Sequence, residues 1–339
     1  MDWSQYKLGV GPMSPEVVAA CLKYSQLNHF PLMFIASRNQ VHANSGYAFN
    51  TENLVKFIKQ NEFYDSNLIK ICRDHCGPYF SDSDKNTSYN EIVNECMDTI
   101  GNDIENNFDL IHIDVSRVEL EKQSRLAESL IQHALNLNPN ILLEFGSEDN
   151  TGQNLFDTLH MVDKQINFAN TYKNNIKFLV NQTGSYTKHT QVGIFNQELC
   201  ASIASKIHDA GFLFKEHNAD YLNMDQVKLH KQTGVDAINI APQLGYIHTY
   251  VINKLGYYYK KELNDFKNYV LSKNLWKKWI VDSVQDVETK FLVSAHYFLN
   301  SEQSMLIKNI IERKSLPFTK ILYDEISIVL DQYRLGYGD

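Results

Sequence analysis

A short apolar segment, a polar turn and an amphipathic segment follow one another eight times between residues 7 and about 243. Several apolar segments are continuous, such as residues 31–36 and 178–180, which is typical of strands buried on both faces of a parallel sheet. The repeated unit therefore predicts an α/β fold. The strands predicted from it span residues 7–11, 30–37, 67–75, 109–116, 140–148, 176–182, 211–217 and 237–243.

The segments between the strands carry helix-terminating signals. Ser14-Pro15 predicts a helix N-cap followed by proline in the first turn, and Gly211 and Gly234 follow helical segments. Eight such units over about 240 residues match a (β/α)8 TIM barrel in size and period. The alternative is a doubly wound open sheet, but such sheets usually have fewer strands, and no GxGxxG or Walker loop follows any predicted strand. We therefore predict a closed barrel.

The strand period ends near Gln243, and helical patterns follow over residues 246–255, 260–272, 276–298, 307–312 and 317–333. This segment is longer than the single helix that closes a barrel. We therefore expect a barrel over residues 1–244 and a helical extension over residues 245–339 that packs on it.

The composition limits the possible partners. A net charge of about −8, with lysines and arginines dispersed along the chain, argues against a nucleic-acid surface. The sequence contains no run of about 18 apolar residues, so we expect no membrane span, and the N-terminus does not resemble a signal peptide. The five cysteines are odd in number and form no CxxC pair, which indicates buried, reduced thiols. We expect a cytoplasmic protein.

Catalytic groups of TIM barrels lie where the strands end, and three histidines occupy such positions. His75 follows Asp74 at the end of the third predicted strand, and His189 and His217 follow the sixth and seventh. Neutral imidazoles on one rim favour a divalent metal, most simply Zn²⁺. The alternative for Asp74 and His75 alone is a turn cap beside a satisfied buried histidine. His112 lies inside a strand, and we interpret it as a core or supporting residue.

Short motifs along nearly the whole chain match a known protein family, in the same order. The motifs are Arg38-Asn39-Gln40-Val41, Asp74-His75-Cys76-Gly77-Pro78, Ile111-His112-Ile113-Asp114-Val115-Ser116, Gly146-Ser147-Glu148, Gln182-Thr183-Gly184 and Glu216-His217-Asn218-Ala219-Asp220-Tyr221. With them, the chain resembles the accessory (Z-type) subunit family of class II tagatose-1,6-bisphosphate aldolase, which includes sugar-phosphate 4-epimerases.

The resemblance implies roles for individual residues. Asp74 would transfer protons, His75, His189 and His217 would ligate the metal, and Glu148 matches the carboxylate on the fifth strand. The Gly-Ser-rich phosphate loop that catalytic class II aldolases carry after strand seven is absent, and residues 218–221 replace it.

The remaining polar groups at the strand ends complete the predicted site. Asp114 is a further candidate for returning a proton, beside Glu148. The candidate substrate-binding residues are Asn39, Gln40, Arg73, Ser116, Gln182 and Asp220.

We expect a metal-dependent ketose or ketose-phosphate 4-epimerase that works by retro-aldol and aldol steps. The main alternative is a subunit of tagatose-1,6-bisphosphate aldolase, either active as an aldolase or serving only to stabilise a catalytic subunit. A sugar-binding module without turnover is the third. The expected partners are a sugar or sugar phosphate and, in addition, a second copy of the chain or an aldolase catalytic subunit.

Overall fold

The computed structural model describes residues 2–43, 46–147, 155–184, 187–188, 191–280, 286–314 and 316–338. Eight parallel strands close into a barrel in the order β1-β12-β11-β8-β7-β6-β5-β2, which confirms the predicted TIM barrel and all eight predicted strand segments. The barrel strands are β1 (Leu8–Val10), β2 (Leu32–Ser37), β5 (Ile69–Cys76), β6 (Leu110–Ile113), β7 (Leu142–Gly146), β8 (Ile176–Val180), β11 (Leu213–Glu216) and β12 (Ala237–Ile240).

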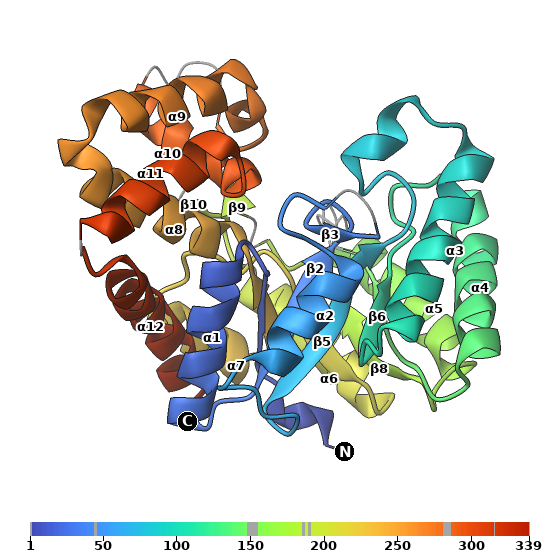
Figure 1. Cartoon of the computed structure of the whole chain (residues 1–339). Coiled ribbons are helices and arrows are strands. Elements are labelled where there is room, and N and C mark those ends of the chain that lie inside the picture. Colours follow the sequence, from blue (N-terminus) through green and yellow to red (C-terminus); the bar gives the residue numbers. More distant parts are fainter. Residues whose placement is uncertain are drawn as a thin grey trace.

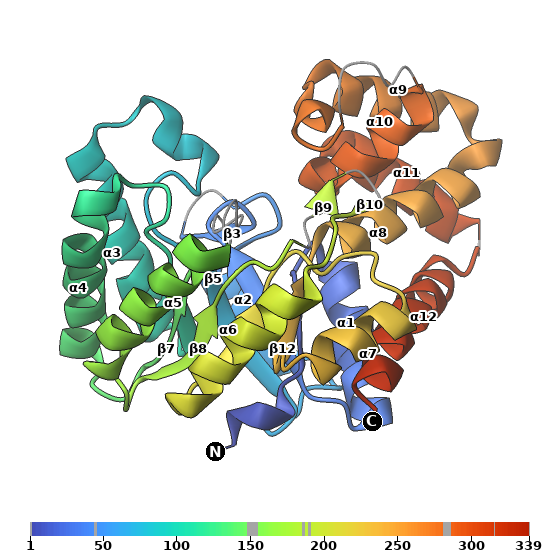
Figure 2. The same ribbon diagram turned by 180° about the vertical axis from the view of Figure 1, so that it is seen from behind.

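Helices surround the barrel (Figures 1 and 2). They are α1 (Pro15–Asn28), α2 (Thr51–Gln60), α3 (Tyr89–Glu105), α4 (Leu120–Leu137), α5 (Leu155–Asn170), α6 (Gln197–Asp209) and α7 (Met224–Gln232). Ser14 caps α1 as expected, because its hydroxyl accepts a hydrogen bond from the amide of Val17 and Pro15 begins the helix. No helix in the described ranges combines the length and the apolar character needed to cross a lipid bilayer.

Short elements lie in the connections. The barrel is preceded by η1 (Trp3–Gln5), and η2 (Asp82–Asn86) follows β5; two small sheets pair β3 (Val41–His42) with β4 (Phe49–Asn50) and β9 (Thr187–Lys188) with β10 (Gln191–Val192).

A group of helices follows the eighth strand and lies at one end of the barrel, at the upper left of Figure 1. We call this group the cap; it comprises residues 242–280 and 286–314. Its elements are α8 (Pro242–Leu255), η3 (Gly256–Tyr258), α9 (Lys260–Ser272), η4 (Leu275–Lys278), α10 (Val287–Ser294), η5 (Ala295–Phe298) and α11 (Glu302–Arg313). Lys308 anchors the cap to the barrel through an ion pair with Glu16 of α1, at 2.6 Å.

The last helix, α12 (Phe318–Tyr337), returns to the barrel and packs between α1 and α7 (Figure 1). The buried hydroxyl of Tyr333 donates a hydrogen bond to the carbonyl oxygen of Ala219 at 2.6 Å. This is the place of the eighth helix in a (β/α)8 barrel. The division predicted at residue 244 falls inside α8, and the structure favours a description in which the cap is inserted between the eighth strand and the eighth helix.

Apolar side chains fill the amino-terminal half of the barrel interior. Trp3 and Tyr6, at the start of the chain, pack there with inward-facing residues of the strands. This layer closes one end of the barrel, so the polar groups above it face the cap. The strand residues of the layer are Met33, Ile35, Cys72, Leu110, Phe178 and Ala237. All five cysteines are free and buried, as expected.

If α12 is part of the barrel, removing its buried atoms destabilises the whole fold. Leu330→Ala deletes a side chain with 0% exposure and is expected to lower the free energy of unfolding by about 2–5 kcal/mol. Ile328→Ala, on the same helix but 58% exposed, is the matched control and should change it by less than about 0.5 kcal/mol. Urea unfolding measures both; an unchanged main transition in Leu330→Ala would show that α12 is an independent arm.

Candidate metal centre

A bulge at the end of β5 directs two neighbouring side chains to the same place. Successive residues of a regular strand point to opposite faces, but the pairing of β5 with β6 shifts in register across Asp74 and His75. His75 has a φ of 46°, which is unusual for a residue other than glycine. Gly77 follows at a close approach, since a Cβ there would lie 1.5 Å from the carbonyl oxygen of Asp114. The bulge therefore brings both the carboxylate and the imidazole to the centre.

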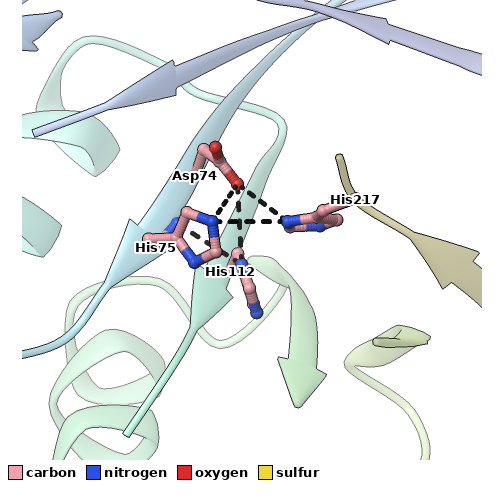
Figure 3. Close-up of side chains that lie close together, drawn as sticks. All are labelled: Asp74, His75, His112 and His217. Carbon is pink, nitrogen blue, oxygen red and sulfur yellow. Dashed lines mark hydrogen bonds and ion pairs between the residues drawn. The ribbon is translucent and has the colours of Figure 1, made fainter. Parts of the chain in front are cut away.

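Four side chains from three strand ends converge at this centre (Figure 3). Asp74, His75, His112 and His217 each offer one ligand atom, and these atoms lie within 4.8 Å of one another. The Oδ1 atom of Asp74 is 3.4 Å from Nδ1 of His217 and 3.7 Å from both Nε2 of His75 and Nδ1 of His112. The sequence analysis did not include His112 among the predicted metal ligands.

The outer nitrogen of each imidazole has an oxygen acceptor. The pairs are His75 Nδ1 with Asp114 Oδ2 at 2.8 Å, His217 Nε2 with Glu144 Oε1 at 2.7 Å, and His112 Nε2 with the carbonyl oxygen of Gly146 at 3.2 Å. These oxygens accept hydrogen bonds, so they favour the tautomers in which the ring proton points outward. The inner nitrogens then face the centre, which is the arrangement of metal-ligating histidines. Those of His75 and His217 lie 3.5 Å apart, and that of His112 also accepts a hydrogen bond from the amide of His75 at 3.3 Å.

The residues of the centre fit a divalent cation. The Oδ1 atom of Asp74 is buried and has no hydrogen-bond partner in the described structure, although it faces three ring nitrogens. Burying an ionised oxygen without a partner is costly, and a cation would compensate it. Three imidazole nitrogens form a donor set that Zn²⁺ takes in catalytic sites, and the carboxylate of Asp74 beside them supplies a compensating negative charge.

Charge around the centre is set by buried groups. Burial raises the pKa of Asp74, but in the absence of a metal the positive charge that His75 and His217 carry when protonated outweighs this and places the pKa at about 2. Glu144 is likewise fully buried; the ammonium group of Lys215, 2.6 Å away, and the hydrogen bond from His217 hold its pKa well below the usual range. Both carboxylates are therefore ionised at neutral pH.

A cavity of about 200 Å³ lies above the centre. Asp74, His75 and His217 line it from the barrel. Trp279, His296 and Tyr297 line it from the cap, which therefore covers the candidate centre. Its further lining residues are Met13, Ile35, Ser37, Asn39, Gln40, Tyr47, Asn218, Asp220, Asn239, Ile240, Ala241 and Pro242.

The predicted metal ligands have different outcomes. The structure brings His75 and His217 together with Asp74, as expected. His189 and Glu148 lie outside the described residues, so their assignments stay predictions. His112, which we interpreted as a core or supporting residue, is buried but contributes a ring nitrogen to the centre.

The predicted substrate-binding residues divide into two groups. Asn39, Gln40 and Asp220 line the cavity. Ser116 lines a separate cavity between α4 and α5, and the side-chain oxygen of Gln182 accepts a hydrogen bond from the amide of Gly184 at 2.9 Å. Neither lies among the residues that the structure places around the centre.

Arg73 does not face the cavity, contrary to its assignment as a substrate-binding residue. It precedes the bulge on β5, so strand alternation turns it outward, away from Asp74. Its guanidinium group is fully buried and binds both carboxylate oxygens of Asp103 on α3, at 2.6 and 2.7 Å. Arg73 therefore joins the strand to the helix behind it.

Asp114 lies behind His75 and not against the cavity. Its carboxylate is fully buried, accepts the hydrogen bond of His75 and is also bonded by the amide of Ser116 at 3.0 Å. This geometry orients the imidazole of His75 and corrects the expectation that Asp114 returns a proton to substrate.

The sequence analysis missed Glu144 and Lys215. Both lie inside strands and point into the barrel, where they form an ion pair beneath the imidazoles. A signal was present, because a glutamate and a lysine within two apolar strands are rarely buried unless they are paired.

Comparisons with known proteins support the fold. No protein-family model matches the sequence, and no curated protein matches it significantly. Among solved structures, a probable tagatose 6-phosphate kinase from Sinorhizobium meliloti 1021 has a TM-score of 0.79 at 15% identity, covering 98% of this chain and 100% of that one. The fructose-bisphosphate aldolase of Campylobacter jejuni has a TM-score of 0.59 at 10% identity (98% and 90% covered). The YdjI aldolase of Escherichia coli K12 has a TM-score of 0.50 at 12% identity (92% and 91% covered). At these identities the similarity concerns the fold.

Metal binding should depend on the converging histidines. His75→Ala, His112→Ala and His217→Ala, made singly, are expected to lose most of the bound metal because each removes one donor. His160→Ala, at an exposed position on α5, is the control and should retain it. Elemental analysis of purified, folded variants measures the content. Full metal content in both His75→Ala and His217→Ala would remove the centre as a metal site.

The buried pair of Arg73 predicts a stability effect. Arg73→Met leaves the Asp103 carboxylate buried without its partner and should cost about 3–5 kcal/mol of unfolding free energy. The double variant Arg73→Met/Asp103→Leu should recover much of this loss. Urea unfolding of the three proteins measures it. Unchanged stability of Arg73→Met with weakened substrate binding would restore the original assignment.

Proposed function

We propose that this chain is a divalent-metal-dependent enzyme that breaks and re-forms the bond between C3 and C4 of a ketose or ketose phosphate, and so acts as a 4-epimerase. The observation that carries the proposal is the convergence of Asp74 with three imidazoles beneath a small polar cavity. The motif resemblance and the aldolases among the proteins of similar fold support the same chemistry.

His75, His112 and His217 would hold the cation, with Asp74 beside it. We keep the predicted His189 as a further ligand. A bound Zn²⁺ ion, the simplest choice for these donors, would act as a Lewis acid toward the carbonyl and hydroxyl oxygens of the substrate.

Asp74 is the proton acceptor in the proposed reaction. Its carboxylate is ionised, lies on the cavity wall and is held by the bulge of β5. In the proposed reaction it takes the proton of the C4 hydroxyl group as the C3–C4 bond breaks. The electron pair of that bond moves onto the C1–C3 fragment, and C4 becomes an aldehyde carbon.

The same residue can complete the reaction. After the aldehyde has rotated, C3 of the first fragment adds to its other face, and Asp74 returns its proton to the C4 oxygen. The product is the C4 epimer, with no net gain or loss of atoms. Glu148 stays the second candidate for this proton.

Other residues of the chain support these steps. Asp114 and Glu144 orient the imidazoles of His75 and His217, and Lys215 keeps Glu144 ionised. The side-chain amides of Asn39 and Gln40 line the cavity wall. They are held in place by hydrogen bonds within the protein, Asn39 with Phe80 and Asp82 and Gln40 with the amide of Ser37, and their remaining capacity suits sugar hydroxyls.

The cap favours epimerisation over release. Trp279, His296 and Tyr297 cover the cavity opposite the strand ends, so a cleaved aldehyde would be retained long enough to rotate and add again. Aromatic rings also suit the apolar face of a sugar.

An aldolase is the second candidate, since it would share the cleavage step and release both halves. The aldolases with a similar fold favour it. Product analysis separates the two, because an epimerase yields one product with the same number of carbons as its substrate and an aldolase yields two fragments.

Asp74→Asn tests the proposal. The amide keeps the shape but removes the base, so turnover should fall by about 10²–10⁴-fold, while metal content stays near that of the unmodified protein. NMR of ketoses and ketose phosphates, each with its C4 epimer, measures turnover. Elemental analysis measures the metal.

Asp98→Asn, at an exposed position on α3, is the matched control and should retain full activity. Equal turnover of Asp74→Asn and the unmodified protein would remove Asp74 from the mechanism. Absence of turnover in the unmodified protein on every sugar would favour the non-catalytic aldolase subunit.

A further inference from the structure

A second cavity adjoins the one above the candidate centre. It has a volume of about 410 Å³ and lies between the segment that follows β5 and the cap. A molecule bound at the centre could therefore extend into it without crossing a wall of the protein. The residues that line both cavities are Ser37, Asn39, His75, Trp279 and Tyr297.

The two cavities differ in charge. Among the described residues that line the first, there are the carboxylates of Asp74 and Asp220 but no lysine or arginine. The described residues that line the second include three cations, Lys85, Arg117 and Lys278. In the absence of a metal, the carboxylates beside the centre would repel an anionic group, whereas the cations of the second cavity would attract it.

Arg117 is held in place by a stack of rings. Its guanidinium carbon lies 4.1 Å from the centroid of the Phe80 ring, and that ring stacks on the imidazole of His75, with centroids 4.7 Å apart and an interplanar angle of 6°. In the described structure its hydrogen bond goes to the carbonyl oxygen of Tyr79, at 2.8 Å from Nη1. The other N–H groups of this exposed side chain can bind an anion.

The two lysines share one carboxylate. Asp82 lies 2.6 Å from the ammonium group of Lys278, which belongs to the cap, and 2.9 Å from that of Lys85. The other carboxylate of this wall, Asp84, is buried and paired with the buried Arg38 at 3.0 Å. Arg38 is also paired with Glu95, at 3.0 Å, so it does not neutralise Asp84 alone. The described residues that line the second cavity therefore carry three cations and two carboxylates, which leaves its wall with a small excess of positive charge.

We propose that the second cavity is an anion subsite that binds the phosphate group of a phosphorylated ketose, with Arg117 and Lys278 as its main donors and Lys85 at its edge. The proposal rests on the function proposed above, because it names the substrate class as a ketose phosphate. A guanidinium group binds two phosphate oxygens at once and an ammonium group adds a point charge. Phosphate binding away from C3 and C4 would contribute binding energy to orient the reacting carbons.

Inorganic phosphate is the probe, measured by titration calorimetry on the metal-loaded protein and repeated on the metal-free protein. We expect saturable binding that Arg117→Gln weakens about 10-fold or more in both forms, since a hydrogen bond from a charged group is removed. Arg125→Gln, at an exposed position on α4 that lines a different cavity, is the matched control and should bind phosphate like the unmodified protein.

Asp82→Asn separates an anion subsite from a contact that merely holds the cap. It removes the competing negative charge while leaving an acceptor for Lys278, so phosphate binding should tighten, whereas Lys278→Gln should weaken it. A purely structural contact would be impaired by both changes. No saturable binding up to tens of millimolar phosphate, or equal binding by Arg117→Gln and the unmodified protein, would overturn the subsite.

Turnover distinguishes this proposal from the one on which it rests. Arg117-dependent phosphate binding in a protein that converts no sugar would support the subsite and contradict the function. Equal kcat/KM for a free ketose and its phosphate, unchanged in Arg117→Gln, would support the function and contradict the subsite.

Discussion

The buried ion pair between Glu144 and Lys215 connects the core of the barrel to its candidate site. The two side chains lie in the barrel interior, 2.6 Å apart, where an unpaired charge would be strongly unfavourable. Apolar side chains fill the barrel below them, and above them Glu144 accepts the hydrogen bond of His217. The pair therefore allows an ionised carboxylate to exist inside the barrel, and that carboxylate determines which nitrogen of His217 faces the centre.

The order of elements after the eighth strand has a consequence for the site. Because α12 completes the ring of helices, the cap is anchored at both ends to the barrel, through α8 and through the segment that leads into α12. Trp279, His296 and Tyr297 are thus fixed opposite the strand ends. The cap also supplies Lys278 to the second cavity, so one inserted segment would both enclose the reacting carbons and contact the far end of the substrate.

Local patterns were sufficient for the strands and for part of the site. Continuous apolar runs with regular spacing predict the eight strands, because a strand whose two faces are both buried needs apolar side chains at successive positions. Asp74, His75 and His217 could be identified because polar side chains at strand ends are unusual unless they have partners. Glu144 and Arg73 could not be assigned correctly, because a charged residue within a strand can point either into the barrel or toward a helix. In addition, the bulge that changes the alternation of side chains in β5 is visible only in the pairing of β5 with β6.

The sequence by itself therefore determined the barrel, the rim on which its polar groups gather and a cluster of imidazoles suited to a metal. Tertiary structure alone decided that His112 joins the cluster, that Arg73 turns to Asp103 and that α12 belongs to the barrel. The physical reason is that the position of a strand depends on the local hydrophobic pattern. The partner of a buried charge, by contrast, lies far away in the sequence, and only the closed barrel and its returning helix bring the two residues into contact.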